Sequence, residues 1–209
     1  MTISKNKRIL VVESEIGNTG SVSRAIKNLG YDPIVSKKKE DIFSSSHIIL
    51  PGVGSFDQGI AKLEKYDLKN NLIKAADEKG IFLLGICLGM QMLATTGYEN
   101  KETKGLDLIP GTIEKLEVNK SLRLPHIGWN QVDFNVSNKL ITDIPDKKDF
   151  YFVHSYFFKS RFKKYEVGCT NYGMNFPSII NKDNIFGVQF HPEKSLKFGI
   201  KIIENFLKI

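Results

Sequence analysis

The segment GICLG at residues 85–89 places a cysteine between two glycines, where an apolar run gives way to a helical pattern. A glycine–x–nucleophile–x–glycine pattern at such a junction is typical of a nucleophile elbow, which holds the central side chain at the top of a sheet. The N-terminus of the following helix would favour a thiolate, and the N–H of Leu88 would face an oxyanion formed during attack. A buried structural cysteine is the alternative. Cys87 is therefore a candidate nucleophile.

A cysteine nucleophile needs a base, and the chain has four histidines. His191 follows an apolar strand pattern and precedes Pro192, which prevents the strand from continuing, so we expect it at the same sheet edge as the elbow. Glu193 follows two residues later, where its carboxylate can hydrogen-bond the imidazole and fix its tautomer. His47 lies inside the strand pattern SSSHIIL and is expected to be structural. The pattern predicts a Cys-His-Glu triad.

A glycine-containing loop, LPGVGSF at residues 50–56, directly follows the apolar run HIIL. Glycines let a backbone approach a ligand closely and adopt unusual dihedral angles. In elbow enzymes such a loop supplies the second oxyanion donor, and an ordinary tight turn is the alternative. The loop has no Gly-Lys-Ser/Thr ending, which excludes a nucleotide-binding P-loop.

The elements that would position these residues alternate in the first half of the chain. Apolar runs of strand length alternate with helical spacing, which is typical of a parallel sheet covered by helices on both faces. We expect one helix to be capped by Ser21 and stopped by Gly30. The predicted strands are residues 8–12, 33–35, 47–50 and 81–86, and the predicted helices are residues 21–29 and 68–80.

The second half has strand patterns at residues 112–118, 131–134 and 150–158. Residues 177–190 predict a hairpin with its turn near Asn181 to Asn184. An amphipathic helix follows Ser195, its expected cap. The predicted fold class is α/β, as a single domain spanning residues 1–209, with a mostly parallel central sheet flanked by helices and antiparallel additions in the second half.

The composition of the chain limits the cellular compartment and the kinds of partner that we expect. The two cysteines, Cys87 and Cys169, are too few for a disulfide framework. The start of the chain has an apolar run too short for a signal peptide, and no run approaches the roughly 18 apolar residues of a membrane span. We therefore expect a cytoplasmic protein without a membrane partner. The net charge is +7, but the basic runs are short, scattered and adjacent to acids, so we expect no nucleic-acid binding.

The motifs GICLGMQ, GVQFHPE and PGVG together resemble those of the class I (triad) glutamine amidotransferases. These enzymes have a flavodoxin-like fold and cleave glutamine to glutamate and ammonia. Within that class, PGVGSF, GLDLIPG, PHIGWN, YFVHSY, NYG and GVQFHPEKS are similar to the glutaminase subunit of imidazole glycerol phosphate synthase. The resemblance runs from about Gly17 to the last residue.

The resemblance implies a role for each matching residue and needs no metal or cofactor. Cys87 would attack the glutamine carboxamide, His191 would move the proton, and Glu193 would orient His191. Val53 and Leu88 would supply the oxyanion N–H groups, with Gly52 letting the loop rotate into place. The positions that hold the amino-acid end of glutamine are Gln91, Glu99, His154, Ser155 and Tyr156. A polar helix face and a core aromatic strand are the alternatives for these five residues.

The resemblance also implies a partner, a cyclase subunit with a (β/α)8 barrel that forms a heterodimer with this chain and receives the ammonia. Five positions match those that face the partner: Asn18, Pro125, Trp129, Tyr151 and Lys194. Trp129 could equally lie in the core. The chain departs from the family after the first strand, where VVESEIGNTGSV has Glu13 and Ser14 in place of the usual Asp and glycine-rich turn.

Three other functions stay open at this point. A paralogue of the glutaminase could feed ammonia to an enzyme that amidates a sugar in a surface-polysaccharide or flagellin-glycan pathway. A stand-alone elbow hydrolase, such as a cysteine peptidase or a γ-glutamyl hydrolase, would need no ammonia acceptor. A non-catalytic binding subunit would lack at least one triad residue, and all three are present.

Overall fold

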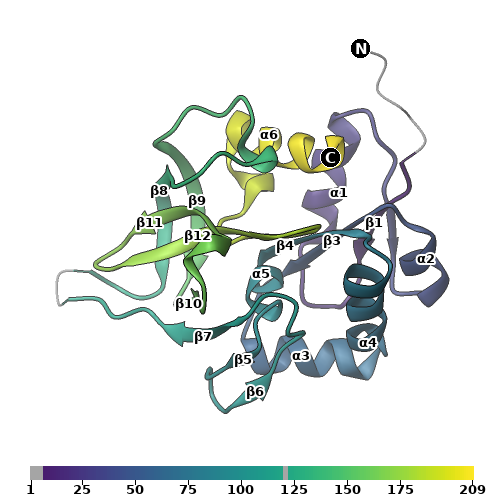
Figure 1. Ribbon diagram of the computed structural model, residues 1–209, viewed down its shortest axis with the longest axis horizontal. Helices are drawn as coiled ribbons and strands as arrows, with labels where there is room; N and C mark the ends of the chain where they lie inside the picture. Colours follow the sequence, from purple (N-terminus) through teal and green to yellow (C-terminus); the bar gives the residue numbers. More distant parts are fainter. Residues whose placement is uncertain (1–6, 120–121) are drawn as a thin grey trace.

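The computed structural model describes residues 7–119 and 122–209. Its centre is a nine-stranded sheet in the order β2-β1-β3-β4-β13-β12-β11-β8-β9. Helices cover both faces of the sheet's parallel half, and a smaller four-stranded sheet lies beside the other half (Figure 1). Residues 1–6, which begin the segment expected to lack a signal peptide, lie outside the described residues. Within the described ranges, no helix is long and apolar enough to cross a membrane.

The parallel half of the sheet consists of five strands: β1 (Ile9–Val12), β2 (Ile34–Ser36), β3 (His47–Gly52), β4 (Phe82–Cys87) and β13 (Ile185–Val188). Their order, β2-β1-β3-β4-β13, has the connectivity of the flavodoxin-like sheet. Ligands of such sheets bind beyond the carboxyl ends of the strands. Cys87 ends β4 and Gly52 ends β3 beside it, so the elbow and the glycine loop meet at that edge.

Two apolar layers hold the helices against the sheet. One layer contains α1 (Thr19–Asn28) and α6 (Leu196–Lys208), and the opposite layer contains α2 (Lys39–Ser44), α3 (Phe56–Lys65), α4 (Leu68–Ile73) and α5 (Leu88–Met92). Alternate residues of β1 divide between the layers: Ile9 and Val11 belong to the layer of α1 and α6, and Leu10 and Val12 belong to the opposite layer. This alternation is what a strand buried on both faces requires.

The antiparallel half consists of β12 (Asn175–Lys182), β11 (Glu166–Asn171), β8 (His126–Phe134) and β9 (Lys148–His154). The smaller sheet has the order β10-β7-β5-β6, from β10 (Tyr156–Ser160), β7 (Gly111–Lys115), β5 (Thr96–Gly97) and β6 (Thr103–Lys104). Short helical turns occur at Lys74–Glu78, Lys139–Ile141, Lys163–Tyr165 and Pro192–Lys194.

The α/β class, the parallel first half and the antiparallel additions agree with the prediction. The hairpin is also confirmed, because β12 and β13 pair antiparallel across Asp183 and Asn184. The helix predicted at residues 68–80 ends as an α-helix at Ile73 and continues as a π-helical turn to Glu78. The strand predicted at 131–134 is the end of the longer β8, whose first half was obscured by Pro125 and by Gly128 with its φ of 137°.

The aromatic run at residues 150–158 was predicted as one strand, and this is wrong. The chain bends at Ser155, so β9 ends at His154 in the large sheet and β10 begins at Tyr156 in the small one. The bend brings three consecutive residues, His154 to Tyr156, to the corner where the two sheets meet. A continuous strand would have pointed them to alternating faces.

Of the two predicted caps, one needs correction. Asn18, and not Ser21, caps α1: its side chain accepts a hydrogen bond from the Ser21 N–H. Ser195 is the N-cap residue of α6, as predicted, but its hydroxyl makes no capping hydrogen bond with that helix. The helices α2 and α3 and the strand β11 were not predicted. In α3 the helical spacing is interrupted by Gly59, which packs closely against the Met92 side chain: a Cβ there would lie 2.9 Å from the Met92 sulfur.

Candidate active site

Cys87 has a strained backbone, with φ 55° and ψ −112°. A positive φ is rare for a residue with a Cβ, and such strain is concentrated at functional sites. The strain arises because β4 ends at Cys87 and α5 begins at the next residue, so the chain reverses direction within one residue. The sharp strand-to-helix turn predicted around Cys87 is present.

Both flanking glycines are required by close backbone contacts. A Cβ on Gly85 would lie 2.6 Å from the carbonyl carbon of Gly89, and a Cβ on Gly89 would lie 1.8 Å from the carbonyl oxygen of Leu50. The start of α5 therefore rests directly on the ends of β3 and β4. Any larger residue at either position would move the cysteine.

His191 and Glu193 form a buried pair after β13. Nδ1 of His191 lies 2.9 Å from Oε1 of Glu193, and the two side chains are only 4% and 2% exposed. Burial lowers the pKa of His191, but hydrogen bonds to the Cys87 thiol and to Glu193 outweigh this and raise the pKa to about 10. The raised value means that the imidazole readily accepts a proton from the cysteine. The three predicted triad residues are thus brought together.

Ser195 holds the histidine turn against β9. Its hydroxyl donates to the carbonyl oxygen of His191 at 2.6 Å and accepts from the N–H of Tyr151 at 3.0 Å. The N–H of His191 in turn donates to the carbonyl oxygen of Tyr151 at 2.9 Å. Sequence analysis assigned Ser195 only to helix capping, so this positioning contact was missed. A serine four residues after the histidine was the only signal for it.

A cavity of about 170 Å³ opens beside the nucleophile. It is smaller than the roughly 300–1,000 Å³ of pockets that hold drug-sized ligands, so it suits a small metabolite. All five predicted glutamine-binding residues line it, together with residues of the elbow and of the neighbouring loops. The lining residues are Gly54, Cys87, Leu88, Gln91, Glu99, Pro125, Val153, His154, Ser155 and Tyr156.

Two of the five candidate substrate residues, Gln91 and His154, have side-chain nitrogens engaged within the protein. Nε2 of Gln91 donates to the carbonyl oxygen of Tyr156 at 2.8 Å. Both ring nitrogens of His154 are also occupied, Nδ1 by that same carbonyl oxygen and Nε2 by His126. Burial lowers the pKa of His154 to about 3, so its ring is neutral. The ring nitrogens of His154 are therefore not available to a ligand, and the residue only forms part of the cavity wall.

Glu99 supplies a carboxylate to the cavity wall. Its Oε2 accepts a hydrogen bond from the N–H of Phe56, the first residue of α3, at 2.8 Å. Burial raises the pKa of Glu99, although the hydrogen bond from Phe56 opposes the shift. A half-buried carboxylate at this position can pair with a ligand ammonium group, which would lower the pKa again.

The two predicted oxyanion donors differ in whether their N–H groups already have a hydrogen-bond partner. Leu88 is the first residue of α5, so its N–H is among those that the helix itself leaves without a partner. The N–H of Val53 instead donates to the carbonyl oxygen of Ile16. A Cβ on Gly52 would lie 2.8 Å from both the Gly89 nitrogen and the Leu88 Cβ. Replacing Gly52 by alanine would therefore displace the elbow as well as hinder loop rotation.

The predicted partner-facing residues lie at the surface. Trp129 is 49% exposed, which excludes the alternative of a core tryptophan. Its ring meets the ring of Tyr151 edge-on at 6.0 Å, and the Lys194 ammonium lies 5.8 Å from the Tyr151 ring. Pro125 and Asn18 are also exposed. Trp129 pairs with Tyr151, and Ile127 with Val153, so this exposed face of β8 and β9 continues to the cavity wall.

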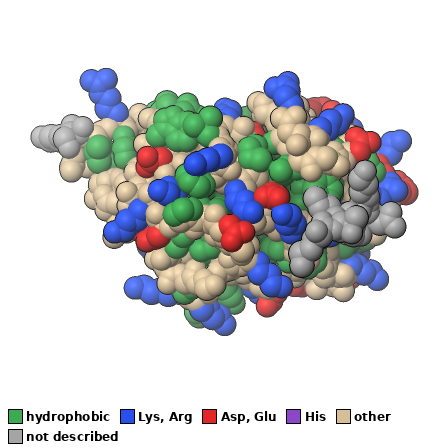
Figure 2. Space-filling view, turned by 90° about the horizontal axis from the view of Figure 1, so that it is seen from above, with side chains coloured by type: hydrophobic (Ala, Val, Ile, Leu, Met, Phe, Trp, Pro, Cys, Tyr) green, Lys and Arg blue, Asp and Glu red, His purple; other side chains and the backbone are tan. Residues whose placement is uncertain are grey.

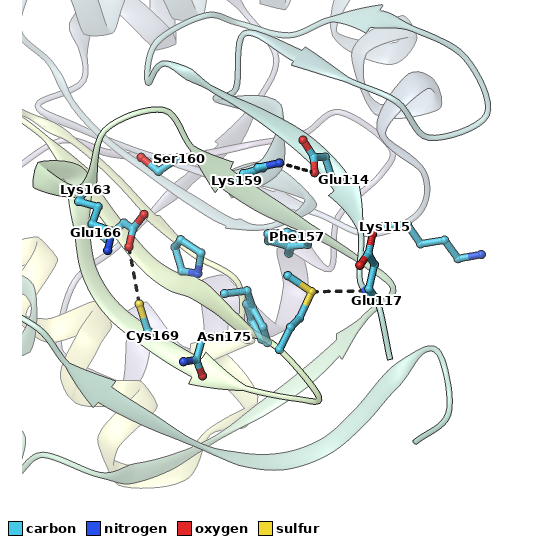
Figure 3. Close-up of a pocket in the computed structure, with 13 residues that line it drawn as sticks. Glu114, Lys115, Glu117, Phe157, Lys159, Ser160, Lys163, Glu166, Cys169 and Asn175 are labelled. Atoms are coloured by element: carbon cyan, nitrogen blue, oxygen red, sulfur yellow. Dashed lines mark hydrogen bonds and ion pairs between the residues drawn. The ribbon is translucent and has the colours of Figure 1, made fainter. Parts of the chain in front are cut away.

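The second cysteine, Cys169, lines a larger cavity of about 420 Å³, between β7 and β10 on one side and β11 and β12 on the other (Figure 3). Cys169 lies 3.9 Å from Glu166, and Asn135 donates to its sulfur at 3.0 Å. Burial raises the pKa of the Cys169 thiol, which disfavours the thiolate. Among the described residues, no histidine lines this cavity, so Cys169 lacks the base that Cys87 has.

The surface charge is dispersed on the face that carries α1 and α6. Lys and Arg side chains lie among acidic and hydrophobic ones and do not gather into one patch (Figure 2). Several ion pairs, such as Lys201 with Glu204 at 3.1 Å, account for the mixing. On this face the basic side chains are thus as scattered as they are along the sequence.

Comparison with known proteins gives consistent matches. The model of the family "Glutamine amidotransferase class-I" matches residues 10–209. The chain is 42% identical to "Imidazole glycerol phosphate synthase subunit HisH 2" of Methanococcus maripaludis, over 96% of this chain and 98% of that protein. It is 41% identical to "Imidazole glycerol phosphate synthase subunit HisH" of Moorella thermoacetica, over 95% of this chain and 93% of that protein.

Solved structures agree in fold. A crystal structure of a glutamine amidotransferase superposes with a TM-score of 0.73 at 20% identity, covering 95% of this chain and 96% of that one. The structure of PurLQS from Thermotoga maritima superposes with a TM-score of 0.71 at 19% identity, covering 96% of this chain and 97% of that one.

Proposed function

Because the chain belongs to the class I glutamine amidotransferases, we propose that it is the glutaminase subunit of an imidazole glycerol phosphate synthase and serves histidine biosynthesis. The relatives at 41–42% identity are named as that subunit, and the similarity covers nearly their whole length. The observation that carries the proposal is the juxtaposition at the sheet edge. A strained cysteine, a buried His-Glu pair and a small cavity lined by Gln91 and Glu99 all meet there.

The proposed reaction proceeds in two halves at Cys87. The sulfur gives its proton to His191 and attacks the carboxamide carbon of glutamine, forming a tetrahedral oxyanion. His191 then protonates the departing nitrogen, so the C–N bond breaks, ammonia leaves and a glutamyl thioester remains. Water, deprotonated by His191, hydrolyses the thioester to glutamate. Glu193 keeps the imidazole in the required tautomer and stabilises the imidazolium.

The cavity supports glutamine as the substrate. Glu99 can bind the α-ammonium group, and the backbone of residues 154–156 can bind the α-carboxylate end. The N–H of Leu88, and of Val53 after rotation of the loop, would stabilise the oxyanion. Hydrolysis of this kind needs no metal or cofactor.

The ammonia is proposed to pass to a cyclase subunit with a (β/α)8 barrel, in a heterodimer. Free ammonia in water would be protonated and lost as a nucleophile. The exposed face that contains Trp129 and Tyr151 adjoins the cavity through Val153, which suits a partner docked over the nucleophile. The two free cysteines, of which Cys87 must stay reduced to react, suit a cytoplasmic enzyme.

The test is release of glutamate and ammonia from glutamine by the chain alone, with a cyclase subunit, and with that subunit bound to its own substrate. Activity that requires the loaded cyclase, together with formation of imidazole glycerol phosphate, supports the proposal. Ammonia transfer only to a sugar-amidating enzyme would identify the paralogue. Hydrolysis of γ-glutamyl peptides without any partner would identify a stand-alone hydrolase.

A further inference from the structure

The side chain of Gln189 lies directly behind the nucleophile and has no role in the steps above. Gln189 follows β13 and is completely buried. Its Nε2 lies 3.8 Å from the sulfur of Cys87, and its Oε1 lies 3.0 Å from Nε2 of Gln91. A buried carboxamide is costly unless both of its ends are hydrogen-bonded. These two contacts supply a partner for each end.

The orientation of this carboxamide is determined by the carbonyl group of Tyr156. A carbonyl oxygen can only accept, so the end of Gln91 that faces it at 2.8 Å must be the amino end. The same amino group faces Gln189, whose facing atom must therefore be the oxygen. Consequently the amino group of Gln189 points at the sulfur of Cys87.

A second set of hydrogen bonds runs from Asn130 through His126 to His154 and ends at the same carbonyl oxygen of Tyr156. Nδ2 of Asn130 donates to the carbonyl oxygen of Asn171 at 3.0 Å and also faces Nε2 of His126 at 3.2 Å. His126 must then carry its proton on Nδ1 and donate to Nε2 of His154, at 3.0 Å. His154 in turn donates from Nδ1 to the Tyr156 oxygen, at 2.9 Å. Every donor in the series has an acceptor.

Both rings in this series are neutral, as the hydrogen bonds require. Burial lowers the pKa of His126 to about 4 and that of His154 to about 3. An extra proton on either ring would place two donors face to face. The series is therefore a stable support that keeps the Tyr156 carbonyl, and with it Gln91 and Gln189, in one arrangement.

The surroundings of the sulfur show what the Gln189 amino group can do. The carbonyl oxygen of Val153 also lies 3.8 Å from the sulfur, and it can accept the thiol proton. Once the proton has moved to His191, that carbonyl repels the negative sulfur, whereas the Gln189 N–H attracts it. Hydrogen bonds to a charged acceptor are stronger than those to a neutral one.

We propose that Gln189 is a positioning residue for the nucleophile: its N–H holds the sulfur of Cys87 and favours the thiolate over the thiol. The Tyr156 carbonyl imposes this orientation through Gln91. The inference rests on the proposed role of Cys87 as the nucleophile. It adds a donor that acts on the sulfur before substrate binds, whereas the oxyanion donors act only during the reaction.

The test is the rate at which iodoacetamide alkylates Cys87 as a function of pH, followed by peptide mass spectrometry on the whole chain. Gln189→Met keeps the length of the side chain and removes the donor. The midpoint of its alkylation profile should move up by about one pH unit, which is about a tenfold slower reaction below the midpoint. The other titratable groups near the sulfur are His191, with Glu193 behind it, and Glu99 and His154 of the cavity wall, and the variant leaves all four in place.

Two further variants separate positioning from simple loss of stability. Asn205→Leu removes another buried carboxamide, which donates to the carbonyls of Leu140 and Thr142 on the α6 side, and should lower stability without moving the midpoint. Gln189→Asn stays polar but is one methylene shorter, so it cannot span both contacts and should move the midpoint like Gln189→Met. If Gln189→Met is too unstable to be measured, the midpoint of the Gln189→Asn alkylation profile tests the proposal instead.

The outcomes distinguish this inference from the proposed function. Alkylation of wild-type Cys87 no faster than that of Cys169 would contradict the nucleophile assignment itself. Fast alkylation of wild-type Cys87, with midpoints of both Gln189 variants unchanged, would overturn only the role of Gln189. An upward shift in the Gln189 variants, and not in Asn205→Leu, supports it.

Discussion

The N–H of Val53 donates to the carbonyl oxygen of Ile16, which turns it away from the oxyanion that would form at Cys87. The loop therefore rests in a state in which its proposed oxyanion donor, the Val53 N–H, is engaged elsewhere, and only the second proposed donor, the Leu88 N–H of α5, remains. Residues 16–18 also include Asn18, one of the proposed partner contacts, so docking of a partner on this segment can release the Val53 N–H. A loop state selected by the partner would link glutamine hydrolysis to the presence of an acceptor.

The first prediction concerns this link. The isolated chain should be a poor glutaminase, and the loaded cyclase partner should raise its rate at least about 10²-fold, because one oxyanion donor is worth about 10²–10³ in rate. Steady-state glutamate release should be measured without partner, with empty partner and with loaded partner. Full activity of the isolated chain would reject the switch and favour the stand-alone hydrolase.

The second prediction concerns the His191–Glu193 pair. Glu193→Gln should lower turnover by about 10²–10⁴-fold, the scale of general acid–base catalysis, and by less than His191→Ala does. The variant loses a carboxylate that helps to raise the pKa of His191. The basic limb of its kcat/KM profile against pH should therefore shift to lower pH. A wild-type rate and profile in Glu193→Gln would make Glu193 a purely structural residue.

The third prediction concerns acid stability. Burial lowers the pKa of His47 to about 4, that of His126 to about 4 and that of His154 to about 3, whereas an unfolded histidine titrates near 6.5. Because the folded values are lower, the unfolded chain binds more protons below about pH 6.5. These histidines thus contribute stability above about pH 6.5 that is lost as the pH falls toward the folded values, by up to about 1.4 kcal/mol per pH unit for each.

Urea unfolding at several pH values between about 7 and about 5 measures this slope. His47 stacks on Phe82 at 5.1 Å and meets Phe206 edge-on. His47→Phe keeps an aromatic ring there and should reduce the pH dependence of the unfolding free energy by the contribution of one histidine. His191 has the opposite effect above about pH 6, because its raised pKa keeps it protonated in the folded chain while the unfolded histidine loses its proton. Below about pH 6 it is protonated in both states and does not contribute, so the slope due to the three buried rings is read between about pH 6 and about pH 5. A flat unfolding free energy would contradict burial of the three rings.

The fourth prediction compares two glycine-to-alanine substitutions in helices. Gly89→Ala would place a Cβ 1.8 Å from the Leu50 carbonyl oxygen, so the elbow must shift, and stability should fall by about 1–3 kcal/mol. In Gly20→Ala the nearest atom is Oδ1 of Asn18 at 3.9 Å, so a gain of about 0.5–1 kcal/mol is expected from helix propensity. Thermal unfolding of both variants checks the contrast.

The proximity of Cys87, His191 and Glu193, and the parallel half of the fold, were predictable because their signals are local. Glycines two residues before and after Cys87, a proline directly after His191, and apolar runs between helical patterns each reflect one nearby constraint. The bend at Ser155 was not predictable, because the aromatic residues on both sides of it favour one strand and only the meeting of two sheets divides them. For the same reason β8 was underestimated, since its PHIGWN segment contains residues that usually end strands.

Other parts of the site depend on contacts between distant segments. Ser195 and Gln189 both lie within the motif GVQFHPEKS, yet their partners, Tyr151, Gln91 and Cys87, come from other strands and helices. Spacing along the chain carries no information on such pairs. The polar series from Asn130 to Tyr156 was missed for this reason, although sequence analysis did single out His154 and Tyr156.

The most direct measurement of the central claim is glutamate release by Cys87→Ser in the presence of the loaded cyclase partner, with Cys169→Ser as the matched control. Serine is a far weaker nucleophile unless a site activates it strongly, so turnover in Cys87→Ser should fall by several orders of magnitude while unfolding and partner binding stay as in wild type. Cys169→Ser should keep wild-type turnover, because Cys169 lines the larger cavity between β7, β10, β11 and β12, whose described lining has no histidine. Retention of a tenth or more of the wild-type rate (about 1.4 kcal/mol in the barrier) by Cys87→Ser would contradict the account.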